Sequence, residues 1–231
     1  ISKYGINLDK THVVGIPRHD CKWIKMIQEK YDKAPDDFND NSILILSRHA
    51  SNGHLLFNDK LKSVKNIKKL FIDKLGMKVV IKLHPNEKQE KILFNKKENI
   101  YENEFGIDNY GLTWIYSDLH VFSLGKGKKL AISFNTGVVL DLIAMGVPCI
   151  EYIESSTKFE KNMTEFTEYE FITRASNYQE LCVYVDKWLI NPYQISELST
   201  SVYKKYFPIF NNSPDKVAIE ILHNIKTTAN A

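Results

Sequence analysis

Short, fully apolar runs alternate along the chain with stretches of helical periodicity. The runs lie at residues 13–16, 43–46, 79–81, 130–132 and 148–150. Because they show no apolar/polar alternation, they are typical of parallel strands that helices cover on both faces. The pattern predicts an α/β fold, a Rossmann-like doubly wound parallel sheet with its core over residues 12–153.

Apolar residues recur every three or four positions from Phe57 to Leu75, which predicts a helix that ends at Gly76. Longer helices are expected over residues 136–145, 178–189, 194–206 and 214–225, and shorter ones over 87–93 and 117–124. Residues 100–101 are interpreted as a strand and residues 154–177 as a loop. The whole chain, 1–231, is predicted to be one domain with a C-terminal helical part over residues 178–228.

Composition excludes several classes of protein. The 231 residues are 43% hydrophobic and 26% charged, which is typical of a globular protein and not of a disordered one. With 31 basic and 28 acidic side chains, the charge gives no argument for a nucleic-acid partner. The three widely spaced cysteines are typical of reduced core residues. The longest apolar stretch, residues 138–153, contains an acid and a Gly-Val-Pro break, so no transmembrane helix is predicted.

Polar and charged residues follow four of the apolar runs. In an open parallel sheet, ligands bind at the carboxyl ends of the strands, where helix N-termini present N–H groups to anions. An arginine, a histidine and a hydroxyl-rich turn at this edge would bind a phosphate or pyrophosphate. An acid one turn into the following helix is placed to accept hydrogen bonds from a ribose. The candidate residues are Arg18, Arg48, His84, Pro85, Ser133, Asn135, Thr136, Gly137 and Asp141.

Structural interpretations of these residues stay open. Pro85 ends a strand, Ser133 and Thr136 are common helix-capping residues, and Asp141 could be a surface acid favoured by the helix dipole. Lysines from Lys60 to Lys74 are interpreted as the solvated face of a helix, which leaves open a peripheral contact with an anionic membrane. The glycine- and lysine-rich residues 125–129 precede a strand, so they are not a Walker A loop. The histidines show no metal-ligand spacing.

Three motifs in a fixed order resemble a known family. They are Gly-x-Pro-Arg at residues 15–18, Lys-x-His-Pro at residues 82–85, and SFNTGVVLDLIAMGVP at residues 133–148. Together they resemble the C-terminal donor domain of GT-B glycosyltransferases. The similarity is greatest to bacterial surface and capsular polysaccharide enzymes with a His-Pro motif, such as CDP-glycerol glycerophosphotransferases, Kdo-transferases and polysialyltransferase-like enzymes.

The resemblance implies roles for these residues. His84 would contact the donor phosphate and stabilise or protonate the departing nucleoside phosphate, whose negative charge grows as the bond breaks. Asn135 and Thr136 would bind the same phosphate, and Arg18 and Arg48 would supply positive charge. Related enzymes usually carry a glutamate for the ribose hydroxyls at the position of this chain's aspartate, Asp141. The resemblance implies a CMP- or CDP-linked donor and neither a metal nor another cofactor.

The resemblance also implies what the chain would need in order to act. The start at Ile1, without Met or a signal-peptide pattern, is interpreted as the start of a fragment. A separate N-terminal domain would bind a glycan or lipid-linked acceptor and supply the catalytic base, so the chain would bind nucleotide without catalysing transfer alone. The expected location is the cytoplasm, including the inner face of the membrane. The alternatives are a UDP-sugar transferase, a nucleotide-sugar 2-epimerase-like enzyme, and a non-catalytic interaction module.

Overall fold

The computed structural model describes residues 11–12, 14–31, 42–50, 55–87, 100–106, 113–116, 119–154, 172–206 and 212–229. At the centre of these residues is a sheet of six parallel strands in the order β3-β2-β1-β4-β5-β6. The strands are Ser42–Leu46 (β1), Lys78–Lys82 (β2), Thr113–Tyr116 (β3), Ala131–Ser133 (β4), Cys149–Tyr152 (β5) and Thr173–Ala175 (β6). This order confirms the predicted doubly wound, Rossmann-like sheet.

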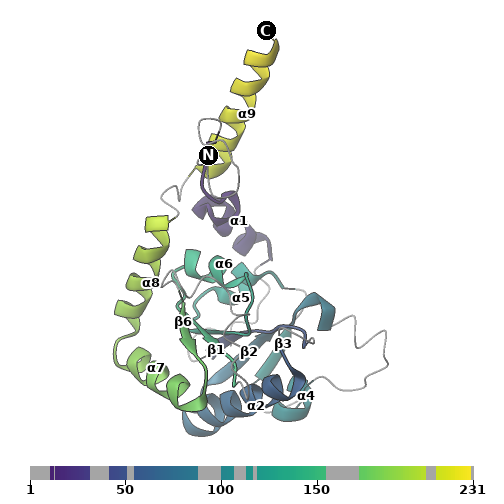
Figure 1. The fold of residues 1–231 in the computed structure, drawn as a ribbon, viewed down its shortest axis with the longest axis vertical. Helices are drawn as coiled ribbons and strands as arrows, with labels where there is room; N and C mark the ends of the chain where they lie inside the picture. Colours follow the sequence, from purple (N-terminus) through teal and green to yellow (C-terminus); the bar gives the residue numbers. More distant parts are fainter. Residues whose placement is uncertain are drawn as a thin grey trace.

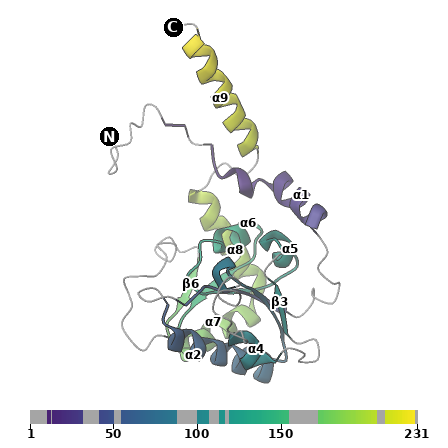
Figure 2. The same ribbon diagram turned by 90° about the vertical axis from the view of Figure 1, so that its right-hand side faces the viewer.

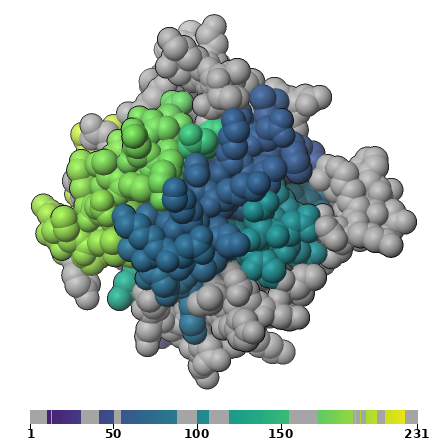
Figure 3. All heavy atoms as spheres, turned by 90° about the horizontal axis from the view of Figure 1, so that it is seen from below, coloured from purple at the N-terminus to yellow at the C-terminus, as the bar shows by residue number. Residues whose placement is uncertain are grey.

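Helices cover both faces of the sheet (Figures 1 and 2). One layer is formed by α2 (Phe57–Ile67), its π-helical continuation η4 (Lys68–Lys74), α4 (Ile100–Phe105) and α7 (Tyr178–Ile190). Seen from outside in Figure 3, α7 in green lies beside the blue surface of α2 and η4. The opposite layer is formed by α1 (Cys21–Tyr31), α5 (Val121–Gly125), α6 (Val139–Ala144) and part of α8 (Pro192–Tyr206). The last helix, α9 (Ser213–Ala229), extends away from the sheet (Figure 1).

Successive residues of a strand belong to opposite layers. Ile43 and Ile45 of β1 pack into the layer that contains α2, whereas Leu44 and Leu46 pack into the layer that contains α6. None of these four side chains is more than 2% exposed. The strand is therefore apolar throughout because both of its faces are buried.

The register brings three strand ends to the same level. Leu46, the last residue of β1, is the partner of both Lys82 at the end of β2 and Ser133 at the end of β4. The loops that follow these strands therefore begin side by side at the carboxyl edge of the sheet.

Several predicted elements differ from the structure. Residues 14–16 form no strand, because Gly15 has a φ of 80° and the 3₁₀ turn η2 (Pro17–His19) follows directly; Val13 lies outside the described residues. Residues 100–101 begin the helix α4 and are not a strand. The strand β6 lies at the end of the stretch interpreted as a loop, and the strand β3 was not predicted.

The longer predicted helices are confirmed within a few residues at α2 with η4, α7, α8 and α9. Gly76 follows the first of them with a φ of 61°, the left-handed conformation expected after a helix end. The helix predicted over residues 136–145 is shorter, since α6 begins at Val139. All but the first residue of the helix predicted over 87–93 lie outside the described residues. Of the helices described, none is long and apolar enough to cross a membrane.

Candidate functional site

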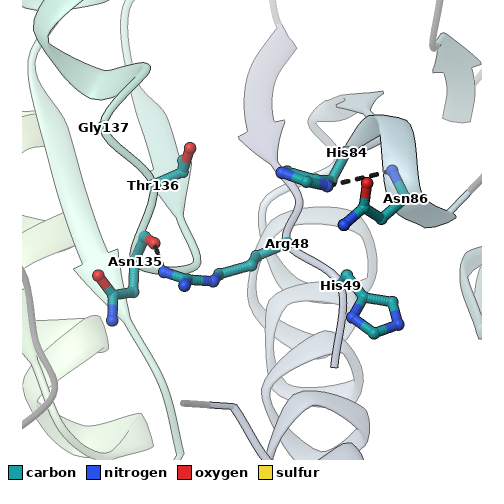
Figure 4. Close-up of a pocket in the computed structure, with 7 residues that line it drawn as sticks. All are labelled: Arg48, His49, His84, Asn86, Asn135, Thr136 and Gly137. Atoms are coloured by element: carbon teal, nitrogen blue, oxygen red, sulfur yellow. Dashed lines mark hydrogen bonds between the residues drawn. The ribbon is translucent and has the colours of Figure 1, made fainter. Parts of the chain in front are cut away.

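A cavity of about 400 Å³ lies among the loops that follow β1, β2 and β4 (Figure 4). Strands β1 and β4 are neighbours, but the chain continues from β1 to β2 on one side and from β4 to β5 on the other. Such a switch point is where open α/β sheets bind their ligands. The lining residues are Arg48, His49, His84, Asn86, Asn135, Thr136 and Gly137.

Five of the nine candidate residues therefore meet at one cavity. His49 and Asn86 also line the cavity, although neither is among the nine candidates; each directly follows a candidate residue. Pro85 is exposed and begins the helical turn that follows β2. Ser133 is fully buried, and its Oγ accepts a hydrogen bond from the backbone N–H of Thr136 at 3.4 Å. Ser133 therefore shapes the turn and does not line the cavity.

Arg48 joins the two loops of the switch point. Its guanidinium donates a hydrogen bond to the backbone oxygen of Asn135 (Figure 4). Asn135 itself has a φ of 50°, a conformation uncommon outside glycine and enriched at ligand sites. Thr136 Oγ1 accepts from the backbone N–H of Val138 at 3.5 Å. A Cβ added at Gly137 would meet no atom within 4 Å, so the cavity is open at this backbone position.

The surroundings of His84 determine which of its ring nitrogens carries the proton. Nδ1 accepts a hydrogen bond from the backbone N–H of Asn86 at 3.2 Å, so the neutral ring carries its proton on Nε2 (Figure 4). Burial is the main cause that lowers the pKa of His84 from 6.5, and positive neighbours lower it further, whereas Glu87 raises it. Those neighbours are Arg48, His49 and Lys60. At pH 7 the ring of His84 is therefore mainly neutral.

The cavity offers hydrogen-bond donors and positive charge to a ligand. Among the described residues that line it none is acidic, and Arg48 provides a permanent cation beside the imidazoles of His49 and His84. Arginine and N–H donors at a strand-end turn are the groups that proteins use to bind phosphate oxygens. The electrostatics of the cavity thus suit an anion.

Arg18 and Asp141 form a separate cluster. The buried Asp141 carboxylate accepts from Arg18 Nη2 at 2.5 Å and is paired with His19 Nε2 at 2.7 Å, and His19 Nδ1 contacts the hydroxyl of Tyr203. Arg18 does not line this cavity: the described residues 14–16 before it form no strand, and its guanidinium donates to Asp141. The expectation that Arg18 supplies positive charge near the phosphate or the domain cleft stays a prediction. Both oxygens of the Asp141 carboxylate are thus already engaged within this cluster. The contact of Asp141 with a ribose stays a prediction.

The described residues contain no group of three or more His, Cys, Asp or Glu side chains that could hold a metal ion. This concerns only that part of the chain, and the expectation that no metal or other cofactor takes part stays a prediction.

Solved structures with the same fold were found, although no protein-family model and no curated protein matches the sequence. A provisionally assigned UDP-N-acetylglucosamine 2-epimerase from Listeria monocytogenes has a TM-score of 0.65 at 14% identity, over 97% of this chain and 56% of that one. S. aureus MnaA in complex with UDP has a TM-score of 0.63 at 14% identity, over 96% of this chain and 56% of that one. The wall teichoic acid polymerase TagF has a TM-score of 0.55 at 14% identity, over 97% of this chain and 54% of that one.

These similarities show a GT-B-like, Rossmann-type fold, in agreement with the resemblance seen in the motifs. The chain spans little more than half the length of the structures that it matches.

Proposed function

We propose that the cavity binds the phosphates of a nucleotide-linked donor, and that the chain is the donor-binding domain of a glycosyl or glycerophosphoryl transferase. The observation that carries the proposal is the meeting of Arg48, His84 and the turn at residues 135–137 at the switch point of the sheet. We further propose a CMP- or CDP-linked donor and a role in bacterial surface polysaccharide synthesis, on the basis of the His-Pro motif.

The lining residues can stabilise a departing nucleoside phosphate. As the bond between donor group and phosphate breaks, negative charge grows on the phosphate oxygens, and donors directed at these oxygens bind the transition state more tightly than the ground state. Arg48 would supply the charge, and the Nε2–H of His84 and the hydroxyl of Thr136 would donate hydrogen bonds. A bound phosphate raises the pKa of an adjacent imidazole, so His84 could then also carry a proton to the leaving group.

The similar structures support nucleotide binding in this fold. One of them is a complex with UDP, another is an epimerase from Neisseria meningitidis bound to UDP-GlcNAc, and a third is a teichoic acid polymerase. Because the chain spans about half the length of these proteins, we propose that the acceptor site and the catalytic base belong to another domain. The glycan or lipid-linked acceptor, and a cytoplasmic location at the membrane face, are part of the same proposal.

Isothermal titration of the 231-residue chain with CMP, CDP, UDP and ADP tests the proposal. We expect CDP to bind with an affinity in the micromolar to millimolar range, and His84→Ala to weaken it by about tenfold or more. His223→Ala, which removes an exposed imidazole on α9, is the matched control and should bind like the wild type. Absence of binding by all four nucleotides would contradict the proposal, as would unchanged CDP affinity in His84→Ala.

A second candidate is a UDP-sugar 2-epimerase-like enzyme, which the UDP-bound structural neighbours favour. In that case UDP should bind more tightly than CDP in the same titrations. Conversion of UDP-N-acetylglucosamine to its 2-epimer by a protein that contains this chain and a second domain would then decide between the two reactions.

A further inference from the structure

A buried ion pair lies next to the cavity. Lys60 of α2 and Glu87, in the turn after β2, are paired through their side chains, which are 4% and 6% exposed. The sequence pattern placed Lys60 on the solvated face of its helix, and the structure corrects this. Neither residue lines the cavity, so the pair has no direct access to a ligand there.

The pair holds the backbone of the two loops that carry Arg48 and His84. Glu87 Oε2 accepts from the backbone N–H of His84 at 2.8 Å, and Glu87 Oε1 accepts from Ser47 Oγ at 2.8 Å. Lys60 Nζ donates to the backbone oxygen of Arg48 at 2.9 Å. A single buried carboxylate–ammonium pair thus joins the loop after β1 to the loop after β2.

A second helix extends this network. The fully buried Tyr101 of α4 donates from its hydroxyl to Ser47 Oγ at 2.6 Å. Burial and the nearby Glu87 carboxylate raise the pKa of Tyr101 well above 10.0, so its hydroxyl stays protonated and remains a donor. The hydrogen bonds around Glu87 therefore have a fixed direction: Tyr101 donates to Ser47, and Ser47 donates to the carboxylate.

Burial of two charges is not by itself a reason for stability. An apolar pair of similar volume is often as stable as a buried ion pair or more stable, because the desolvation of the charges offsets their attraction. What an apolar pair would not supply here is an acceptor for the His84 N–H and a donor for the Arg48 carbonyl. The Lys60–Glu87 pair therefore differs from an apolar pair in its hydrogen bonds to the backbone of the two loops.

We infer that Lys60 and Glu87 are positioning residues, which hold His84 and Arg48 in the arrangement that binds the donor phosphates. This inference rests on the proposed function for the ligand. Lys60 and Glu87 do not line the cavity, and the sequence pattern did not identify them as part of the site.

Three variants separate a positioning role from a purely structural one. Lys60→Met leaves the Glu87 charge buried and unpaired, and should lower the melting temperature. The double variant K60M/E87L removes both charges, and should regain most of that melting temperature but bind CDP about tenfold or more weakly than the wild type. K60M/E87Q is also neutral but keeps an amide oxygen that can accept from the His84 N–H, and should recover part of the CDP affinity.

A double variant K60M/E87L with the CDP affinity of the wild type would overturn the inference. Equal affinities of K60M/E87L and K60M/E87Q would overturn it as well, since the acceptor for His84 would then be irrelevant. If the double variants do not fold, Ser47→Ala removes one contact to Glu87 without burying an unpaired charge. It should weaken CDP binding about threefold, and unchanged binding would count against the inference.

An NMR titration of the His84 ring provides a readout that needs no ligand. In K60M/E87L the loss of Glu87 and the loss of Lys60 have opposite effects on the pKa of His84, while Arg48 and His49 remain. The loss of Glu87 is the larger of the two and lowers the pKa, so only a shift of His84 out of its buried position raises it toward 6.5. We expect a pKa above that of the wild type, and a lower pKa, which the two charge losses alone would give, would overturn the inference. If the wild type binds none of the nucleotides, the proposed function fails, and the titration still decides whether the pair positions the ring.

Discussion

His84 is the residue whose ionisation most directly couples the cavity to pH. Its pKa in the folded chain lies below 6.5, its value in an unfolded chain, because burial disfavours the charged ring. Between these two values the unfolded chain binds more protons than the folded one. The contribution of His84 to stability is therefore fully present above pH 6.5, falls as the pH decreases through this window, and levels off below the folded pKa.

Replacement of His84 by Gln should remove this pH dependence. We expect the free energy of unfolding of His84→Gln to fall less steeply below about pH 6.5 than that of the wild type. Urea denaturation at several values between pH 5 and pH 7 measures the difference. Identical slopes in the two proteins would mean that the ring is not held neutral by its surroundings.

Gly137 offers a way to fill the cavity without disturbing the fold. A Cβ there meets no protein atom within 4 Å, and the backbone is not in the left-handed region. We expect Gly137→Ala to change the free energy of unfolding by no more than about 0.5 kcal/mol. The methyl group would occupy space proposed for the phosphates, so the affinity for CDP should fall by about tenfold. Titration and denaturation of the same preparation give both quantities, and unchanged affinity would count against phosphate binding at this turn.

At the scale of elements, the helical segment from α2 through η4 ends at a glycine for a conformational reason. Gly76 also has open space at its Cβ position, but its φ of 61° is strained for alanine. Gly76→Ala should therefore lower the free energy of unfolding by about 1–2 kcal/mol. Because Gly76 lies at the opposite end of β2 from the cavity, the affinity for CDP should stay that of the wild type. Loss of affinity without loss of stability would contradict this assignment.

Elements were predictable where the local pattern has one interpretation. The runs at β1 and β2 contain only aliphatic residues, and the long amphipathic helices are periodic over several turns. By contrast, β3 (Thr-Trp-Ile-Tyr) and β6 (Thr-Arg-Ala) contain no aliphatic run, and at four and three residues they are too short to show a period. Residues 100–101 show an apolar pair that fits a strand or a helix, and only the packing of Tyr101 against the loop after β1 decides between them.

The site was predictable to the extent that it depends on strand ends. Arg48, His84 and the turn at residues 135–137 directly follow strands, so the parallel topology alone brings them together. The pairing of Lys60 with Glu87 joins residues 27 positions apart, and nothing in the pattern around Lys60 distinguishes it from the exposed lysines of its helix. Arg18 was expected at the cavity because the short apolar run before it, at residues 13–16, was interpreted as a strand.

At the scale of the molecule, one cluster around the buried Asp141 carboxylate joins three distant parts of the described chain. Asp141 of α6 is bonded to Arg18 and His19 of η2, and His19 contacts Tyr203 of α8. We expect Asp141→Asn to lower the free energy of unfolding by about 1–3 kcal/mol, because it weakens two contacts of a buried charge. Urea denaturation checks this. The affinity of the variant for CDP compared with 2′-deoxy-CDP then tests the ribose contact, since Asp141→Asn should abolish any preference for the ribose if that contact exists.

The proposed function requires that the cavity between the loops after β1, β2 and β4 binds the phosphates of a nucleotide. Titration of the ¹⁵N-labelled chain with CDP, followed by two-dimensional ¹H–¹⁵N NMR, tests it residue by residue. We expect the largest shift changes at the backbone amides of Arg48, His84, Thr136 and Gly137. A second cavity at the opposite edge of the sheet, lined by Lys25, Lys126 and Lys128 among others, is the natural competitor for an anion. Shift changes centred on residues 125–128, or none at saturating CDP, would contradict the claim.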